Sequence, residues 1–369
     1  MGQRHPPLEA LVISQSFWAG KRVLVTGHTG FKGSWLVLWL HSLGAEVSGY
    51  ALAPPSNPSL WSQLALSSQI VDKTADVRDL DQLTSAFAEH QPEIVLHLAA
   101  QSLVRPSYDD PVATYATNVM GTVNVMEAAR RSKSVRVLVN VTSDKCYENR
   151  EWVWGYRESD AMGGYDPYSN SKGCAELVTA SYRNSFFHPY KYAEHGLALA
   201  SVRAGNVFGG GDWALDRIVP DVMRAALAGC PARVRNPNSI RPWQHVLDPL
   251  HGYLTLAEQL WSDPAKAGGW NFGPAEQDAV PVGKLTDMLV SHWGDGATWA
   301  ADSGQHPHEA NYLKLDCSKA RSLLGWQPIL PLPTALQWAV DWYKAYSRQE
   351  NLQAVCIEQI RRFEELAKQ

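Results

Sequence analysis

A turn with three evenly spaced glycines, set between a predicted strand and a predicted helix, constrains the fold more than any other feature of the sequence. The apolar run Val23 to Val25 leads into Gly27, Gly30 and Gly33, and Ser34 to Leu40 continues with the apolar spacing of a helix. Gly27 is expected to allow the sharp turn, Gly30 the close approach of a pyrophosphate and Gly33 the tight packing of helix on strand. Free N–H groups in the first helical turn attract negative charge. We therefore predict a dinucleotide site formed by Gly27, Thr29, Gly30, Phe31, Lys32 and Gly33.

Strand-like and helix-like segments alternate along the first half of the chain. Apolar and β-branched residues predict strands over 46–52, 93–100 and 135–141. A helix is predicted from Asp110 to Arg131. This alternation is typical of a Rossmann-type α/β fold, a doubly wound parallel sheet whose ligands lie beyond the carboxyl ends of the strands. The alternation is lost after Val202. We predict a dinucleotide-binding domain over 18–205, with room for a later segment to return to its sheet, and a smaller, mainly substrate-binding domain over 206–369.

The end of the second predicted strand bears on the choice of cofactor. A site for NAD usually has an acidic residue there for the adenosine ribose, whereas this chain has Tyr50-Ala51-Leu52-Ala53. No arginine is present for a 2'-phosphate, so we expect NAD, held loosely at the ribose. A carboxylate could meet the adenine edge, and small residues at strand ends let a cofactor lie close. Further cofactor contacts are therefore expected from Asp76, Val77, Leu98, Ala99, Ala100 and Asn118.

Two groups of polar residues follow the later strands. Ser143-Asp144-Lys145 comes directly after the strand predicted over 135–141, and Tyr168 and Lys172 open a helix four residues apart. Because that spacing puts both side chains on one helix face, the ammonium is expected to lower the pKa of the phenol. Both groups are expected to point at a bound sugar and nicotinamide. After a dinucleotide turn, this combination predicts a catalytic site.

Composition excludes several other kinds of protein. The 369 residues are 45% hydrophobic, which is enough for one large α/β domain with a smaller companion. The net charge of -4, with scattered lysine and arginine, gives no sign of a nucleic-acid groove or a membrane surface. Five widely spaced cysteines predict neither disulfides nor a metal site. No secretion signal or membrane-length apolar run is seen, and we expect a cytoplasmic enzyme.

These motifs resemble the nucleotide-sugar 4,6-dehydratase group of the extended short-chain dehydrogenase/reductase superfamily. The resemblance covers nearly the whole chain, and the stretches that carry it are TGHTGFKGSWL, TSDKCYEN, GYDPYSNSKGCAELV, RAGNVFGGGDWALDRIVPD, RPWQHVLDPL and HPHEANYLKLDCSKA. Other members of the group typically have Asp-Glu where this chain has Asp144-Lys145. That difference points to the branch that acts on CDP-glucose.

The resemblance implies a redox-neutral reaction in which NAD oxidises the sugar at C4, water is lost across C5 and C6, and the hydride returns to C6. Tyr168, with Lys172 and Ser143, would handle the proton of O4. Asp144 would donate a proton to the leaving C6 hydroxyl, which requires a pKa raised by burial. Lys145 would remove H5 or stabilise the enolate as a cation. Substrate contacts are implied for Gln101, Arg105, Asn206, Arg217, Arg235, Arg241 and Glu309.

Members of this group commonly pair through the helices that start near Asp110 and Asp166, so a homodimer or a dimer of dimers is expected. The resemblance also implies deoxysugar biosynthesis, as for lipopolysaccharide O antigens. A different nucleotide-sugar dehydratase and a 4-epimerase are the alternatives within this fold, but an epimerase needs no acid to expel a C6 hydroxyl. A non-catalytic protein that only binds NAD has no need of Ser143, Tyr168 and Lys172 together.

Overall fold

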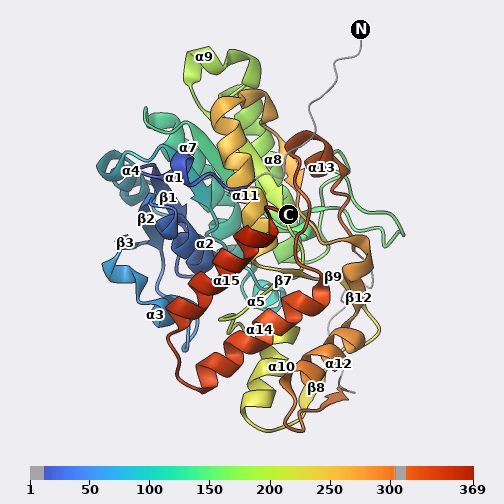
Figure 1. The fold of residues 1–369 in the computed structure, drawn as a ribbon. Helices are drawn as coiled ribbons and strands as arrows, with labels where there is room; N and C mark the ends of the chain where they lie inside the picture. Colours follow the sequence, from blue (N-terminus) through green and yellow to red (C-terminus); the bar gives the residue numbers. More distant parts are fainter. Residues whose placement is uncertain (1–11, 303, 305–312) are drawn as a thin grey trace.

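A seven-stranded parallel sheet forms the centre of the structure, a computed structural model that describes residues 12–302, 304 and 313–369 (Figure 1). Every neighbouring pair of strands runs in the same direction. In spatial order the strands are β11 (Gly269–Asn271), β6 (Ala198–Arg203), β5 (Val137–Val141), β4 (Ile94–His97), β1 (Arg22–Thr26), β2 (Glu46–Ala51) and β3 (Val71–Thr74). The predicted doubly wound Rossmann-type fold is confirmed.

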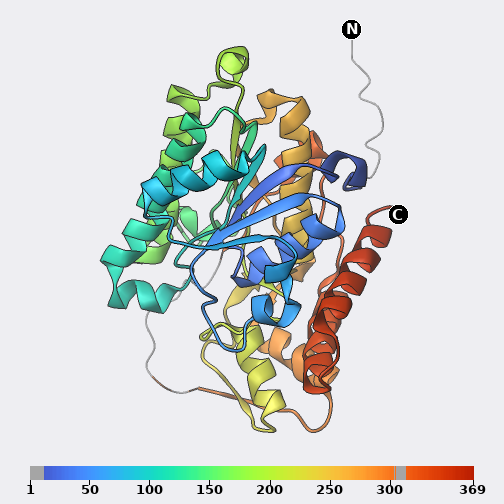
Figure 2. The same cartoon turned by 90° about the vertical axis from the view of Figure 1, so that its left-hand side faces the viewer.

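Helices cover both faces of the sheet because its central strands are apolar on both sides. In β1, Val23 and Val25 face one hydrophobic core and Leu24 faces the other, and all three are buried. The first core also takes side chains from α2 (Phe31–Ser42), α11 (Leu247–Ser262) and α15 (Leu352–Leu366). The second takes them from α4 (Leu80–His90), α7 (Gly121–Arg131) and α8 (Pro167–Ser185). Figure 2 shows α8 and α15 on opposite sides of the sheet.

The helix predicted from Asp110 to Arg131 is not uniform. Its first part is α6 (Pro111–Tyr115), which follows α5 (Val104–Asp109), and its last part is α7. Between α6 and α7 lies a wider π-helical turn, Ala116–Met120, which the apolar periodicity does not reveal. Such turns often occur at functional sites, and this one carries the buried Asn118.

Short paired strands and helices make up most of the later part of the chain, at the lower end of Figure 1. The strand pairs are β7 (Val207–Phe208) with β10 (Gln244–His245), β8 (Ala232–Val234) with β13 (Trp299–Ala301), and β9 (Ile240–Pro242) with β12 (Ala279–Pro281). The helices there are α10 (Ile218–Leu227), α12 (Val282–Trp293) and α14 (Leu332–Ser347). The short helices elsewhere are α1 (Gln15–Trp18), α3 (Leu60–Leu64), α9 (Tyr192–His195) and α13 (Ser318–Leu324). Within the described residues, no helix combines the length and apolarity that crossing a bilayer demands.

Asp248→Asn is expected to raise the free energy of unfolding at about pH 8. The substitution should also make the free energy of unfolding depend less on pH. Asp248, in α11, accepts hydrogen bonds from the N–H groups of Ile329 (2.7 Å) and Leu330 (3.4 Å), while its second carboxylate oxygen has no partner. Burial, assisted by Asp278, raises the pKa of Asp248 from 3.8 to about 7. Asparagine keeps the accepting oxygen and carries no charge.

The sign of the effect follows from the proton held by the folded protein. The contribution of Asp248 to stability is full below about pH 4, where both states are protonated, and is lost as the pH rises to about 7. The full change corresponds to about 4 kcal/mol, at about 1.4 kcal/mol per pH unit. Urea unfolding at about pH 5 and about pH 8 should show about 3 kcal/mol of this change, because the rest is already lost below about pH 5. A wild-type loss of stability no larger than that of the variant contradicts the prediction.

Candidate active site

The glycine turn joins β1 to α2 with no room for side chains at two positions. Gly27 has φ of +73°, and a Cβ there would lie 2.6 Å from the Ala99 nitrogen at the end of β4. A Cβ on Gly33 would lie 2.2 Å from the Gly27 carbonyl oxygen. Gly30 stands directly before α2, whose first N–H groups have no acceptor inside the helix. The turn is therefore built to receive an anion such as a pyrophosphate.

The region expected to hold the adenosine is fixed by contacts between neighbouring strands. The Thr29 hydroxyl donates to the Leu52 carbonyl oxygen (2.9 Å), and the Tyr50 hydroxyl donates to the Asp76 carbonyl oxygen (3.1 Å). The Asp76 carboxylate itself accepts two hydrogen bonds from the Arg78 guanidinium, at 2.6 and 2.9 Å. The Val77 carbonyl accepts from the side chain of Asn124 (3.0 Å). Asp76 and Val77 are thus held rigidly in the main chain, while the carboxylate of Asp76 is engaged by arginine.

The end of β4 is anchored to the wide turn that carries Asn118. The Ala99 N–H donates to the Thr26 hydroxyl (3.2 Å), which keeps the Leu98-Ala99-Ala100 segment against β1. The Asn118 side chain accepts from the Gln101 N–H (2.8 Å) and donates to the Gln101 carbonyl (2.9 Å) and to the Ser171 hydroxyl (2.8 Å). Asn118 therefore connects the segment after β4 to α8, the helix that carries Tyr168 and Lys172.

The predicted catalytic residues of two separate segments meet at the carboxyl end of β5. Ser143 lies two residues beyond β5, and its hydroxyl donates to the Asp144 carboxylate (3.0 Å) and accepts from the Lys145 N–H (3.2 Å). Ser143 is also near enough to the phenol of Tyr168, in the first turn of α8, to lower its pKa. Asp144 and Tyr168 are buried and Lys145 is half-buried. The Ser143 hydroxyl thus lies near both the acid candidate Asp144 and the phenol.

The surroundings of Asp144 favour the protonated form that a general acid needs. Burial raises the pKa of Asp144, against the opposing effects of Lys145, Ser143, Lys32 and Arg241. Its carboxylate fills the space above Gly205, where an added Cβ would lie 2.1 Å from Oδ2. The predicted raising of this pKa is therefore present in the structure, with the physical cause that was expected.

Gly205→Ala is expected to push the Asp144 carboxylate out of place and to lower kcat by about 100-fold, the cost of a displacement of about 1 Å at reacting groups. Gly268→Ala is the matched control, because an added Cβ there meets only the flexible Lys319 side chain, 3.5 Å away. Steady-state rates and melting temperatures of both variants measure the effect. An active Gly205→Ala enzyme contradicts the role of this contact.

Tyr168 and Lys172 differ from the sequence expectation in one respect. They lie on the same face of α8, but the Lys172 ammonium donates to the Val141 carbonyl (3.3 Å). Burial raises the pKa of Tyr168 to about 12, although Ser143 and Arg217 act to lower it. The expected lowering of the phenol pKa is thus wrong for the protein alone, because desolvation outweighs the nearby positive charge. Burial also lowers the pKa of Lys172 to about 8, against the effect of Glu176.

Positive charge is concentrated around this site. Burial, Arg217 and Lys172 lower the pKa of Lys32 to about 8, while Asp144 and Asp212 oppose the shift. The Arg217 guanidinium forms an ion pair with Asp212 (3.0 Å) and donates to the Ser102 hydroxyl (3.2 Å). The sequence prediction placed Lys32 with the cofactor and Arg217 with the substrate. The structure brings both into the electrostatic surroundings of the reacting groups.

The other residues predicted to bind substrate have different surroundings. Arg105 and Arg235 converge on one carboxylate oxygen of Asp216, at 3.1 and 2.9 Å. Arg241 is close enough to Asp144 to lower its pKa, and Asn206 has φ of +37° in the loop after Gly205. The Gln101 side chain donates to the Leu103 carbonyl (2.9 Å) and the Thr114 hydroxyl (3.1 Å). Glu309 lies outside the described residues.

Sequence reasoning missed three residues that shape this site. Asp212 and Asp216 hold the arginines just described, and Gly205 makes room for Asp144. The signal for Asp212 and Asp216 was present, because both lie within five residues of Arg217 in the sequence. Nothing in the sequence marks the contact of Gly205 with Asp144, because 61 residues separate the two.

Comparisons with known proteins show which family the chain is similar to. Residues 24–337 match the family model described as GDP-mannose 4,6 dehydratase. The chain is 56% identical to the CDP-glucose 4,6-dehydratase of Salmonella typhimurium, over 92% of this chain and 95% of that protein. It is 25% identical to the dTDP-glucose 4,6-dehydratase of the same organism, over 89% of this chain and 94% of that protein.

Solved structures show the same fold at lower sequence identity. The dTDP-glucose 4,6-dehydratase of Streptomyces venezuelae, determined with NAD bound, has a TM-score of 0.74 at 22% identity. That alignment covers 89% of this chain and 98% of the other. The family match spans most of the chain, and the Salmonella enzyme of 56% identity is aligned over nearly its whole length. The chain therefore belongs to the family of nucleotide-sugar 4,6-dehydratases, which are enzymes of the hydro-lyase class.

Proposed function

We propose that this enzyme converts CDP-glucose into CDP-4-keto-6-deoxyglucose, with NAD as its cofactor. The observation that carries the proposal is the buried acid Asp144, which accepts a hydrogen bond from the Ser143 hydroxyl close to Tyr168. A 4-epimerase needs the tyrosine and lysine but no acid that expels a C6 hydroxyl. The 56% identity to an enzyme named for CDP-glucose supports the choice of nucleotide.

The residues around the glycine turn fit NAD. Gly27 and Gly33 leave the cradle free of side chains, and the N–H groups that open α2 would meet the pyrophosphate. Lys32 adds a cation at the same helix end, and Leu98 to Ala100 lie along the end of β4. When bound, NAD supplies a hydride acceptor for C4 and returns the hydride to C6.

Tyr168 and Ser143 act on the C4 hydroxyl in the first step. The Tyr168 oxygen takes the O4 proton as the hydride leaves C4, and the Ser143 hydroxyl hydrogen-bonds to the same oxygen. The positive charge of oxidised nicotinamide would favour the phenolate, which burial alone disfavours. Lys172 lies one turn further along α8 on the same helix face and adds positive charge there.

Asp144 and Lys145 act on the resulting 4-keto sugar. The ketone makes H5 acidic, H5 is removed, and the protonated Asp144 gives its proton to the C6 hydroxyl, which leaves as water. We assign Lys145 to this step, either as the base that takes H5 or as the cation that stabilises the enolate. The hydride then adds at C6 and a proton at C5, so the overall change is the loss of one water.

Incubation of the purified protein and NAD with CDP-glucose tests the reaction, with UDP, dTDP and GDP hexoses in parallel. The expected result is loss of one water from CDP-glucose alone, seen by product mass and by alkali-induced absorbance of the 4-keto product, with no net NADH. Turnover of another nucleotide sugar instead contradicts the assignment of CDP-glucose and identifies that sugar as the substrate. Absence of water loss from all of them contradicts the dehydratase assignment.

We further infer that the protein is a homodimer, or a dimer of such dimers, in the cytoplasm, where its product would enter deoxysugar synthesis such as that of O antigens. Large apolar side chains are exposed on α5, α6, the wide turn and α8, namely Tyr108, Val112, Met120 and Leu177. Val112, at 78% exposure, is the most exposed of them. Five unpaired cysteines support a reducing compartment.

Light scattering tests the assembly, with Val112→Glu as the variant that places a charge on the exposed helices. The expected result is a dimer or tetramer mass for the wild type and a lower mass for the variant. A monomeric wild type rules the assembly out.

A further inference from the structure

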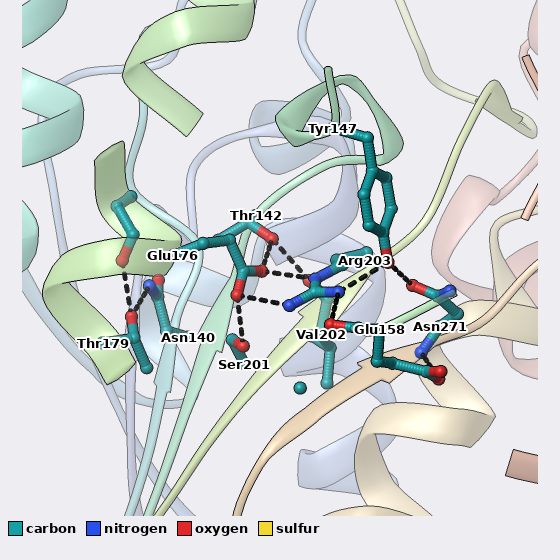
Figure 3. Close-up of polar contacts among 12 residues, drawn as sticks. Asn140, Thr142, Tyr147, Glu158, Glu176, Thr179, Ser201, Val202, Arg203 and Asn271 are labelled. Carbon is teal, nitrogen blue, oxygen red and sulfur yellow. Dashed lines mark hydrogen bonds and ion pairs between the residues drawn. The ribbon is translucent and has the colours of Figure 1, made fainter. Parts of the chain in front are cut away.

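A buried ion pair lies beneath the catalytic segment, between α8 and β6 (Figure 3). The Glu176 carboxylate accepts from Nε (2.9 Å) and Nη2 (2.8 Å) of Arg203, and both side chains are at most 4% exposed. Although burial acts to raise the pKa of Glu176, Arg203 and the hydroxyls of Ser201 and Thr142 hold it below its usual value. The pair therefore stays ionised, with planar, two-point geometry.

Glu176 is attached to the start of the catalytic segment. The Thr142 hydroxyl donates to the Glu176 carboxylate (2.5 Å), and Thr142 immediately precedes Ser143. Glu176 also lies four residues after Lys172, on the same face of α8. The carboxylate thus joins the residue before Ser143 to the helix that carries Tyr168 and Lys172.

Arg203 is attached to the end of the same segment. Its Nη1 donates to the Tyr147 hydroxyl (2.5 Å), and Tyr147 lies two residues after Lys145. The Tyr147 hydroxyl in turn donates to the Asn271 side chain in β11 (2.7 Å), and its ring stacks on Tyr156 at 5.2 Å. Figure 3 shows Thr142 and Tyr147 attached to the two members of one ion pair.

We propose that Glu176, Arg203, Thr142 and Tyr147 form a clamp whose function is to position Asp144 and Lys145 relative to Tyr168 and Lys172. The inference rests on the proposed dehydratase function, because only water elimination needs both groups of residues in one arrangement. The clamp grips the four-residue segment Ser143 to Cys146 at both ends. These are positioning residues, since none of them supplies a reacting atom.

Stability alone does not account for this arrangement. Buried ion pairs contribute little net stability compared with apolar side chains of similar volume. What a buried ion pair provides is fixed geometry. Fixed geometry matters here because Asp144 must reach O6 of the sugar while Tyr168 reaches O4 of the same sugar. Oxidation at C4 relies on Tyr168, Lys172 and Ser143. Because Ser143 lies at the Thr142 end of the segment and Lys145 nearer the Tyr147 end, opening the Tyr147 end should impair elimination more than oxidation.

Tyr147→Phe and Thr142→Val open the clamp at one end each while leaving both charges in place. Phenylalanine keeps the ring that stacks on Tyr156, so Tyr147→Phe removes little besides the hydroxyl. We expect each variant to slow elimination by roughly 10- to 100-fold. With Tyr147→Phe, oxidation at C4 should keep close to its wild-type rate, so NADH absorbance accumulates in a single turnover, which the wild type does not show.

Thr179→Val is the matched control. Thr179 lies on α8 as Glu176 does, is fully buried, and accepts a hydrogen bond from Asn140 of β5 (2.8 Å), but its side-chain hydrogen bonds go to Asn140 and Ala175 rather than to a member of the clamp. It should lose a similar amount of thermal stability to Thr142→Val without accumulating NADH. NADH accumulation in this control, or its absence from both clamp variants, overturns the proposal.

Wild-type turnover on the nucleotide-sugar panel is measured first and tests the proposed function by itself. The clamp is then judged by the ratio of oxidation to elimination rates on whichever nucleotide sugar the wild type dehydrates. An unchanged ratio with a lower melting temperature shows that the residues stabilise the fold only, which also contradicts the proposal.

Discussion

Tyr168→Phe is expected to lower kcat for the proposed substrate, CDP-glucose, by about 10²–10⁴-fold, the usual contribution of a positioned acid–base group. Phenylalanine keeps the ring in its buried place at the start of α8 but cannot accept the O4 proton. No C4 oxidation follows, so NADH should not appear even in a single turnover. Binding of NAD should remain largely intact, because the glycine turn is unchanged.

Stopped-flow absorbance of NADH and titration with NAD measure these two outcomes. Tyr182→Phe serves as the control, because Tyr182 lies farther along the same helix and contacts Phe186 instead of the site. Its kcat should match that of the wild type. Near-normal turnover by Tyr168→Phe would overturn the assignment of Tyr168 as the base for O4.

Lys145→Met separates the two halves of the reaction. The variant should still oxidise C4, because Tyr168, Lys172 and Ser143 are intact, but elimination should fall by about 10²–10⁴-fold. NADH then remains trapped with the 4-keto sugar. Release of the 6-deoxy-4-keto product at the parent rate would show that Lys145 has no chemical role.

Lys145→Arg distinguishes a base from an electrostatic partner. Arginine keeps the positive charge but is not deprotonated in proteins, so it cannot remove H5. If Lys145 acts as the base, the arginine variant should trap NADH as the methionine variant does. If Lys145 stabilises the enolate, arginine should restore much of the elimination rate.

Features set by short sequence patterns were predictable. The spacing of Gly27, Gly30 and Gly33 reports a local turn, and the spacing of Tyr168 and Lys172 reports a helix face. The doubly wound parallel sheet followed from the alternation of strands and helices, although its number of strands was not predicted. In each of these the signal is a local pattern of residues close in the sequence, so periodicity carries the information.

Features that depend on contacts between distant segments were not predictable. Arg203 pairs with Glu176, 27 residues away, and with Tyr147, 56 residues away. Two hints existed, because Arg203 ends an otherwise uncharged strand and Glu176 continues the spacing of Tyr168 and Lys172. The pKa of Tyr168 was mispredicted because burial, which the sequence does not report, outweighs the effect of neighbouring cations.

Helix α2 is synthesised early but covered late. Its Trp39 packs edge to face against Phe363 of α15, with ring centroids 5.7 Å apart, and donates to the Glu364 carboxylate (2.8 Å). About 310 residues separate Ser42 from Leu352. At a synthesis rate of about 5–20 residues per second, α15 therefore begins to be made about 15–60 s after α2 is complete. During that interval the Trp39 indole lacks the contacts that α15 gives it in the folded protein. The last helix made thus completes the packing around the first helix of the glycine turn.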